Sequence, residues 1–154
     1  EKQPDTAFNY YERTVTINPS FADAYYRMGV IAFQKKQNDK AIQYMQKALQ
    51  YDASHLDALS FLGIFYYQAN QPQKAIPLFQ KALKIDPKRA DIHKNLALAY
   101  VKKGQLEKEM SESEIKQSIS SFEFYLKYQP NAPDAEQIKK IIVALKKNLN
   151  PPKP

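Results

Sequence analysis

Three aspartates recur at one fixed spacing along the chain, and their side chains are of a type that can carry catalytic or metal-binding chemistry. Asp23, Asp57 and Asp91 are separated by 34 residues each, a pattern that could mimic a carboxylate cluster. Each of them also stands where the first turn of a helix is expected, and the partial positive charge of a helix N-terminus favours a carboxylate there. We therefore interpret the three aspartates as helix-start residues and predict no metal site.

Other residue types that perform catalysis are scarce. The chain has no cysteine, two histidines and three glycines, which excludes thiolate zinc sites, iron–sulfur clusters, cysteine nucleophiles and glycine-rich phosphate loops. His55 stands at a boundary between repeated segments and His93 takes the place of a large helix residue, so both are interpreted as structural. Since no nucleophile, base and orienting group converge, we predict no catalytic residue, no cofactor and no enzyme activity.

Length and charge restrict the partners. The chain has 154 residues, of which 44% are hydrophobic, and 23 basic against 16 acidic side chains, a composition typical of one folded domain. The arginines Arg13, Arg27 and Arg89 are scattered, which argues against nucleic acid. No apolar run approaches the roughly 20 residues that span a bilayer, so we expect a soluble protein, cytoplasmic or periplasmic, with membrane contact no more than peripheral. Because the chain begins with Glu1 instead of Met, we expect it to be part of a longer one.

The elements that must position these residues follow an internal period of 34 residues. Small residues recur at this spacing, for example Gly29 and Gly63, and so do large ones such as Met45 and Phe79. The same register reaches back to Ala7. A period of this length is typical of stacked helical units, which bury a continuous core only together with their neighbours.

The sequence resembles the tetratricopeptide repeat, whose 34-residue pattern is W-x2-L-G-x2-Y…A-x3-F…P. The closest match to this pattern is made by Leu59, Leu62, Gly63, Tyr66, Ala75, Phe79, Ala82 and Pro87. The resemblance covers roughly residues 4–130. It implies an all-α fold: a right-handed superhelical solenoid of antiparallel helix pairs, with about eight helices.

The period divides the chain into repeats. Each full repeat is expected to be a helix pair, and a single helix is expected at either end. We expect one tetratricopeptide array over residues 1–150, made of a half repeat at 4–18, repeats at 22–55, 56–89 and 90–132, and a capping helix at 133–149, followed by a flexible tail at 151–154.

The last repeat departs from the period. Pro87 and Pro130 are 43 residues apart, so this repeat contains nine extra residues, which we place near 109–117. Ser111 followed by Glu114 predicts a capping box and therefore the start of the second helix at this point. Insertions in repeat arrays map to loops on one face, which is sometimes the binding face.

The two terminal helices are expected to differ. Near the C-terminus, Ile138 and Ile142 belong to an apolar stripe with lysines on the opposite side, as a capping helix requires. The N-terminal helix is the second of a pair without its partner. We therefore expect Phe8, Tyr11 and Val15 to be partly exposed.

The resemblance also implies a binding surface, because in the family the first helices of successive repeats line a concave groove that holds an extended peptide or a helix. Lys94 and Asn95 match fragments of the family's carboxylate clamp. Val30 and Phe61, however, stand where that clamp needs polar residues, so an apolar or amphipathic segment is expected instead. The family's groove positions correspond to Asp23, Tyr26, Val30, Phe33, Gln34, Asp57, Ser60, Ile64, Tyr67, Gln68, Asp91, Lys94, Leu98, Val101 and Lys102.

Two functions are left open by the sequence. The first is a scaffold or adaptor that recruits a protein or peptide partner through the groove, although the aromatic residues Tyr26, Phe33 and Tyr67 could serve instead to pack neighbouring helices. The second is an assembly module, in which a homo-oligomer forms through the uncapped N-terminal helix. In that second case the basic C-terminal helix would dock to an anionic surface.

Overall fold

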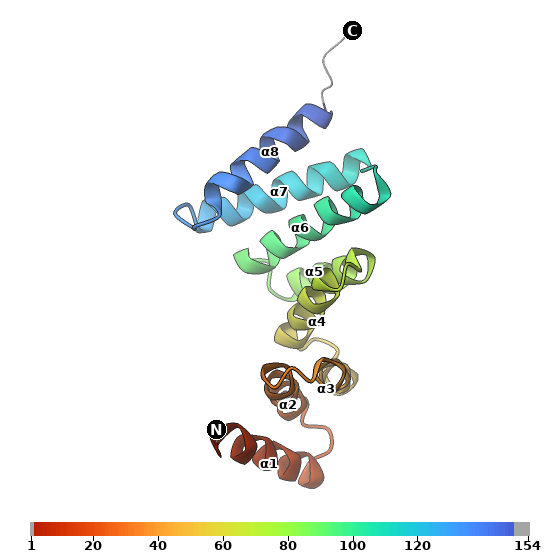
Figure 1. Cartoon of the computed structure of the whole chain (residues 1–154), viewed down its shortest axis with the longest axis vertical. Coiled ribbons are helices and arrows are strands. Elements are labelled where there is room, and N and C mark those ends of the chain that lie inside the picture. The colour runs from red at the N-terminus through yellow and green to blue at the C-terminus, as the bar shows by residue number, and fades with distance from the viewer. Residues whose placement is uncertain (1, 150–154) are drawn as a thin grey trace. The chain divides into compact units, whose positions relative to one another are not determined.

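The computed structural model describes residues 2–149, with side chains from Thr6 onward, and this part of the chain forms helices joined by short loops (Figure 1). The predicted all-α class and the eight helices are confirmed for the described residues, which contain no strand. The tail predicted at 151–154 lies outside them. None of the described helices is both long enough and apolar enough to cross a membrane. In chain order the helices are α1 (Lys2–Ile17), α2 (Ala22–Gln34), α3 (Asn38–Tyr51), α4 (Leu56–Gln68), α5 (Pro72–Ile85), α6 (Ala90–Glu107), α7 (Glu112–Tyr128) and α8 (Ala135–Leu149).

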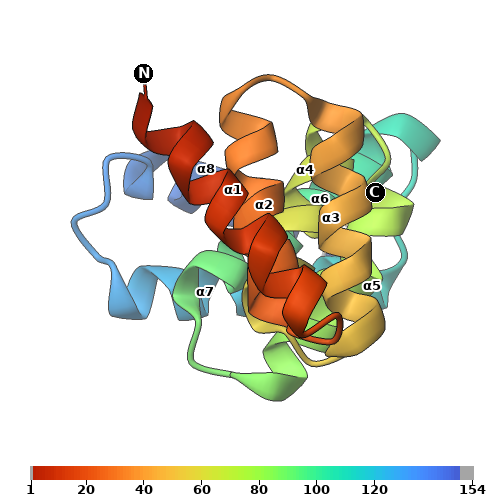
Figure 2. The same cartoon turned by 90° about the horizontal axis from the view of Figure 1, so that it is seen from below.

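The chain forms two compact units, and the boundary between them falls inside α4, between Leu62 and Gly63. In the first unit α2 and α3 pack along each other, and α1 lies against α2 (Figure 2). In the second unit α6 packs on α5 and α7, and α8 packs on α7. Each unit contains its own set of fully buried apolar side chains.

A glycine allows the two helices of a pair to approach closely. In the first unit Gly29 of α2 faces Met45 of α3, and a methyl group added to Gly29 would lie 2.8 Å from Cε of Met45. In the second unit the same addition at Gly63 would lie 2.5 Å from Cε1 of Phe79. Both large side chains are fully buried. The helices pack at this distance because the two facing positions carry no side chain.

The last repeat keeps this core with a different spacing. Ser118 and Phe122 of α7 stand 43 residues after Ala75 and Phe79 and are fully buried as those residues are. The extra residues lengthen both helices, since α6 has 18 residues where α2 and α4 have 13, and α7 has 17 where α3 and α5 have 14. Most of the segment 109–117, in which the extra residues are expected, is therefore helical.

Local signals in the sequence set the helix ends. α7 begins with the predicted capping box, in which the Glu114 N–H donates to Ser111 Oγ at 3.3 Å and the Ser111 N–H donates to the Glu114 carboxylate at 2.9 Å. Pro72 lies in the first turn of α5, where its missing N–H breaks no helical hydrogen bond. At the end of α6, Lys108 adopts the left-handed conformation, with φ at 59°, and terminates the helix.

α8 has an apolar side and a charged side. Its apolar side chains, Ile138 among them, are buried in the core of the second unit. Its lysines Lys139 and Lys140 are exposed and stand 43 residues after Leu96 and Ala97, which are buried in α6. The side that would pair with a second helix in a full repeat is therefore charged in α8.

Ser118 is fully buried, and its hydroxyl has no hydrogen-bond partner within the described part of the chain. We expect Ser118→Ala to raise the free energy of unfolding by about 1 kcal/mol, because it removes an unsatisfied buried hydroxyl and because alanine favours helices. Urea unfolding followed by circular dichroism measures the change. The control is Ser120→Ala, at an exposed position of the same helix, which should change stability by less than about 0.5 kcal/mol. An equal gain in both variants would contradict the effect of burial.

Candidate functional site

α2 carries apolar residues on more than one side. The side with Tyr25 is buried inside the first unit. On another side Tyr26 and Val30 are half-buried, and 39% of Phe33 is exposed. The Phe33 ring meets the Phe61 ring edge-on, with their centroids 5.1 Å apart. The first unit thus presents a small apolar and aromatic surface, formed by Tyr26, Val30, Phe33 and Phe61.

A polar cluster adjoins this surface at the start of α2. The Tyr26 ring lies 5.0 Å from the His55 ring, and Nε2 of His55 lies 3.7 Å from a carboxylate oxygen of Asp23. The other ring nitrogen of His55 accepts the N–H of Ala58 at 3.3 Å, in the first turn of α4. The histidine therefore caps a helix, which agrees with its structural interpretation.

In the second unit, two of the predicted groove residues lie in direct contact. Nζ of Lys102 lies 4.4 Å from the centroid of the Tyr67 ring and donates a hydrogen bond to the Tyr67 carbonyl oxygen at 3.1 Å. Leu98 and Val101, on the same helix as Lys102, are half-buried and pack against the core of the second unit. The second unit thus presents a mixed surface of apolar side chains and a cation placed over an aromatic ring.

Lys94 is held by other residues of the chain. Its ammonium donates to the Asp134 carboxylate at 3.0 Å and to the Tyr125 hydroxyl at 3.5 Å, and Tyr125 donates to the second Asp134 oxygen at 2.8 Å. Burial alone would lower the pKa of Lys94, but the hydrogen bond and charge of Asp134 raise it. Burial would raise the pKa of Asp134, but the hydrogen bonds from Lys94 and Tyr125 lower it. The triad ties α6 and α7 to the residue that precedes α8.

The remaining predicted groove residues differ in exposure. Asp91 is exposed and accepts a hydrogen bond from the Arg89 guanidinium at 2.8 Å, which lowers the pKa of Asp91. Ser60 is buried, with 7% of its surface exposed, so its hydroxyl offers a ligand little area. Of the others, Ile64 is half-buried, and Gln34, Asp57 and Gln68 are exposed.

Sequence reasoning missed the two residues that hold Lys94. Asp134 follows the extra residues, so the 34-residue period gives no signal for it. Tyr125 stands 43 residues after Ala82 and is nearly fully buried. A buried tyrosine hydroxyl needs a hydrogen-bond partner. A tyrosine in the place of a small alanine was therefore the signal available in the sequence.

The aspartates and the histidine that could have served as catalytic or metal-binding groups have structural roles. Asp23, Asp57 and Asp91 lie in the first turns of α2, α4 and α6. His93 stacks on Phe124 with ring centroids 4.1 Å apart, and its Nε2 lies 3.0 Å from a backbone carbonyl oxygen. Among the described residues, no group of three or more His, Cys, Asp or Glu is arranged to hold a metal ion. The aspartates are helix-start residues, as interpreted from the sequence.

Two family models match the chain. One model of the tetratricopeptide repeat matches residues 20–88, and a second model of the same repeat matches residues 78–110. Together they cover more than half of the chain. The chain belongs to the tetratricopeptide repeat family. The resemblance drawn from the spacing of small and large residues is thereby confirmed.

Solved tetratricopeptide structures share the fold. YrrB is 21% identical with a TM-score of 0.76, and the match covers 96% of this chain and 72% of that protein. MamA is 21% identical with a TM-score of 0.75, covering 95% and 80%. The first tetratricopeptide domain of Spaghetti (RPAP3) is 18% identical with a TM-score of 0.67, covering 81% and 93%. A comparison with curated protein sequences finds no match.

Asp134→Asn should lower the free energy of unfolding at about pH 7, because Lys94 loses its charged acceptor. We expect a loss of about 1 kcal/mol after allowance for the partial exposure of both side chains. The pKa of Asp134 is lowered in the folded chain. Its stabilising effect is therefore present above the ordinary pKa of an aspartate and is lost as the pH falls through the folded-state value. Urea unfolding at about pH 7 and about pH 3 should show the difference between the two proteins shrinking in acid.

The matched control is Glu136→Gln, which removes the carboxylate of an exposed pair with Lys139. This variant should unfold at nearly the same urea concentration as the original chain, because exposed pairs contribute little. A destabilisation by Asp134→Asn that stays constant down to about pH 3 would show that its charge is not the cause.

Proposed function

We propose that the chain is a non-catalytic scaffold or adaptor module that binds an apolar or amphipathic peptide or helix of a protein partner. Two structural neighbours support a peptide as the ligand. YrrB is described as a tetratricopeptide protein with an unusual peptide-binding site, and the Spaghetti (RPAP3) domain was solved bound to the HSP90 peptide SRMEEVD. Because these proteins are 21% and 18% identical to this chain, they support peptide binding and carry no information on the peptide sequence.

The observation that carries the proposal is the aromatic surface of α2. Tyr26, Val30 and Phe33 are spaced three or four residues apart, so they share one side of the helix. All three keep exposed area although they are apolar. Aromatic side chains bury large areas at low cost in conformational entropy, which makes them effective anchors at interfaces. A partner that covers this side of α2 would gain binding free energy from its burial.

The second unit supports an apolar ligand as well. Tyr67, Leu98 and Val101 offer partly exposed apolar surface, and we propose that they contribute to binding in the same way. The ammonium of Lys94 is already engaged by the Asp134 carboxylate. An incoming carboxylate would have to displace that contact. This supports an apolar or amphipathic segment over a free C-terminal carboxylate as the ligand.

Selection from a phage library of random dodecapeptides on the immobilised chain tests this proposal. The selected peptides should be rich in apolar residues at helical spacing. A synthetic copy should bind Tyr26→Ala/Phe33→Ala at least about tenfold more weakly than the original chain, because two anchoring side chains are lost. Fluorescence anisotropy of the labelled peptide measures both affinities. The control is Tyr128→Ala, which removes an aromatic ring that is 54% exposed elsewhere. Equal binding by all three proteins would overturn the proposal.

A second function, self-assembly through α1, is favoured by exposed side chains on that helix. Tyr10 and Ile17 leave 67% and 86% of their surfaces exposed and line a shallow groove along α1. Phe8 and Tyr11, which the sequence predicts to be partly exposed, are half-buried. Phe8 packs edge-on against Tyr44, with ring centroids 5.9 Å apart. The surface that α1 offers to another molecule is therefore centred on Tyr10 and Ile17.

The repeat register supports this second function. Ala48 of α3 and Ala82 of α5 are fully buried, whereas Thr14, at the corresponding position of α1, is half-buried. We infer that α1 of one copy covers α1 of another in a homo-oligomer. Lys140 and Lys147 on α8 make no ion pair within the described chain and would give such an assembly peripheral contact with an anionic surface.

Light scattering of the purified chain over a concentration series tests self-assembly. The molar mass should rise with concentration for the original chain and stay at the monomer value for Tyr10→Ser/Ile17→Ser, because the apolar contact is removed. Val143→Ser is the control, since Val143 is 54% exposed on α8 and lies far from α1 in sequence. A monomer at every concentration would rule out the assembly function.

A further inference from the structure

A row of exposed lysines runs along one side of α5, which is the second helix of its repeat. Lys74, Lys81 and Lys84 lie within the helix, and Lys88 follows shortly after its last turn. The spacing of seven, three and four residues places the helical lysines on one side of α5. All four residues are exposed. Nζ of Lys74 lies 5.3 Å from the centroid of the Tyr66 ring, so the other three lysines form the part of the row that reaches solvent without an aromatic neighbour.

No carboxylate of α5 balances these cations. Asp and Glu are absent from α5, whereas α3 and α7, two other second helices, each contain at least one of them. Asp86, directly after α5, is the one acidic residue within 73–90, and its carboxylate accepts the backbone N–H of Lys88 at 3.0 Å. The ammonium groups of Lys81, Lys84 and Lys88 make no ion pair within the described residues. These three cations are therefore available to another molecule.

The carboxylates of the second unit are largely engaged by other basic side chains. Those of Asp91, Glu107, Glu114, Glu123 and Asp134 all form ion pairs within this unit. A second copy of this chain would therefore have few free carboxylates to offer to the lysine row. The charge of the row favours an acidic partner that is a different molecule.

A hollow of about 350 Å³ lies beside the row, between α5 and α6. Leu83 of α5 and Leu96 of α6 supply its apolar lining, and Gln80 and Lys84 supply its polar lining. The Gln80 amide is held in place because it donates to the Tyr100 hydroxyl at 2.7 Å. A hollow at the lower end of the range usual for ligand sites, about 300–1,000 Å³, offers room for one apolar side chain. The lysine row and an apolar contact thus lie next to each other.

The chemistry of this surface favours a protein over nucleic acid or a bilayer. Arginine is the residue that recognises phosphate with two parallel hydrogen bonds, and the four cations of the row are all lysines. Phe79, the aromatic residue of α5, is fully buried, so α5 offers no ring on which a base could stack. A flat membrane would meet the protruding lysines and leave the hollow between α5 and α6 unfilled. A protein segment can use both features.

We propose that the lysine side of α5 binds an acidic amphipathic helix of a protein partner. Carboxylates spaced three and four residues apart on that helix pair with Lys81, Lys84 and Lys88, and one apolar side chain enters the hollow between Leu83 and Leu96. Pairs of this kind between adjacent helices select the partner and its orientation. Single exposed ion pairs contribute little, whereas several in one row act together.

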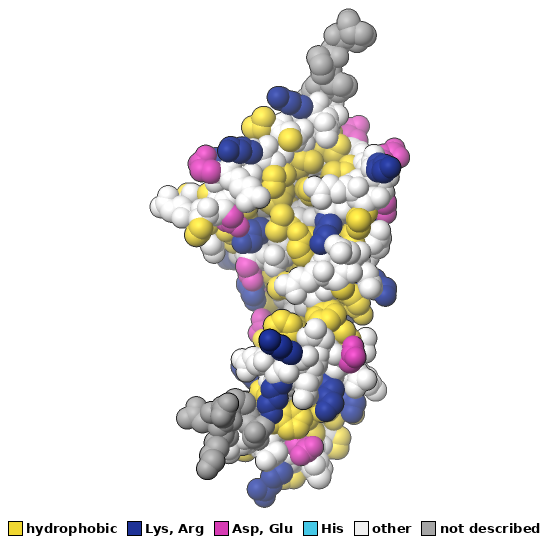
Figure 3. All heavy atoms as spheres, viewed as in Figure 1, with side chains coloured by type: hydrophobic (Ala, Val, Ile, Leu, Met, Phe, Trp, Pro, Cys, Tyr) yellow, Lys and Arg dark blue, Asp and Glu magenta, His cyan; other side chains and the backbone are white. Residues whose placement is uncertain are grey.

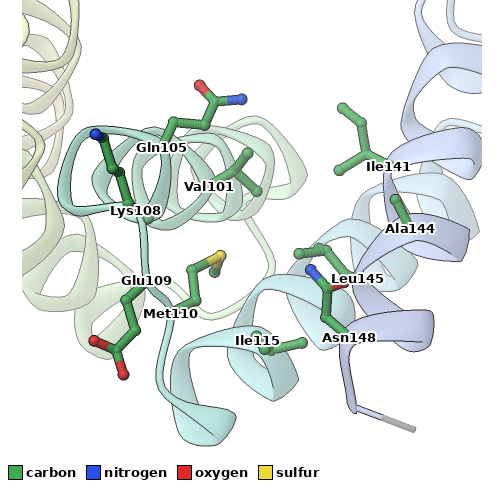
Figure 4. A pocket seen from close by; sticks show the side chains of 11 residues that line it. Val101, Gln105, Lys108, Glu109, Met110, Ile115, Ile141, Ala144, Leu145 and Asn148 are labelled. Carbon is green, nitrogen blue, oxygen red and sulfur yellow. The ribbon is translucent and has the colours of Figure 1, made fainter. Parts of the chain in front are cut away.

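This surface is separate from the predicted groove, whose positions lie on α2, α4 and α6. Hydrophobic side chains gather over α6, α7 and α8 on the face shown in Figure 3. A pocket of about 510 Å³ lies between these helices, and Figure 4 shows Val101 and Ile141 on opposite sides of it. Ile141 and Ala144 stand 43 residues after the groove residues Leu98 and Val101. That pocket therefore continues the groove, whereas the lysine side of α5 contributes no residue to it.

A synthetic helix tests the proposal. The probe repeats Glu-Ala-Ala-Leu-Glu-Ala-Ala three times, so that its glutamates recur every three or four residues. Fluorescence anisotropy of the labelled probe measures its affinity for the full chain. Lys81→Gln/Lys84→Gln/Lys88→Gln should bind it at least about tenfold more weakly, because three opposing charges are lost. Raising the salt concentration from about 0.01 M to about 0.15 M should reduce the difference between the two proteins.

A second triple variant, Lys108→Gln/Lys140→Gln/Lys147→Gln, is the matched control. It removes the same charge from three exposed lysines of the second unit that likewise make no ion pair within the described part of the chain. This control should bind the probe as the original chain does. A probe with alanine in place of leucine should bind the original chain at least about tenfold more weakly, because no apolar side chain fills the hollow.

Chemical coupling locates the bound probe. A carbodiimide joins a carboxylate to a neighbouring ammonium group through an amide bond, and mass mapping of the digested product identifies the lysine that has reacted. The glutamates of the probe should be attached to Lys81, Lys84 or Lys88. Tyr26→Ala/Phe33→Ala should bind the probe unchanged, which separates this surface from the one proposed on α2.

Four results would overturn the proposal: no binding at millimolar probe, equal binding by the two triple variants, equal binding of the alanine probe, or coupling confined to other lysines. Vesicles of phosphatidylcholine and phosphatidylserine test the membrane alternative. If the chain sediments with these vesicles through the same three lysines while the helical probe does not bind, the partner is an anionic membrane. The proposed protein partner would then be wrong.

Discussion

Close packing at one small residue in each helix pair is the constraint on which the rest of the structure depends. Gly29 against Met45 and Gly63 against Phe79 bring paired helices so near that an added methyl group has no room. The fully buried alanines around these contacts are close-packed as a result. Because one side of each first helix is used in this packing, its remaining apolar residues must find other contacts. On α2 these residues are the aromatic ones proposed to bind a partner.

Some of the charged side chains in this chain fasten neighbouring helices to one another. The net charge is +7, yet Lys94 is engaged by Asp134, and Lys103 bonds the Glu114 carboxylate at 2.7 Å and the Glu107 carboxylate at 2.8 Å. These hydrogen bonds raise the pKa of Lys103 and lower that of Glu114. The bond to Glu114 joins the lengthened end of α6 to α7, and the bond to Glu107 lies within α6. The contact between these two helices is therefore held by an ion pair as well as by apolar side chains.

The sequence predicts the helical class, the number of helices and the capping box, because each depends on residues that are close in the chain or one repeat apart. It does not predict the contacts that Lys94 makes with Tyr125 and Asp134. Asp134 follows the extra residues, where the 34-residue period no longer indicates which helices meet. The sequence also does not predict that the Ser118 hydroxyl is buried, since a serine and an alanine fit the same small position. Tertiary packing alone decides these features.

The lysines of α8 restrict which side of the array can pack against a further helix. Lys139 and Lys140 stand in the register of Leu96 and Ala97, so another helix could pack on that side only by burying two ammonium groups, at a cost of several kcal/mol for each. α1 presents apolar side chains at the opposite end of the register. The apolar side chains of α1 could be covered by a packed helix without burying a charge, whereas a helix could pack on the lysine side of α8 only after both lysines were replaced.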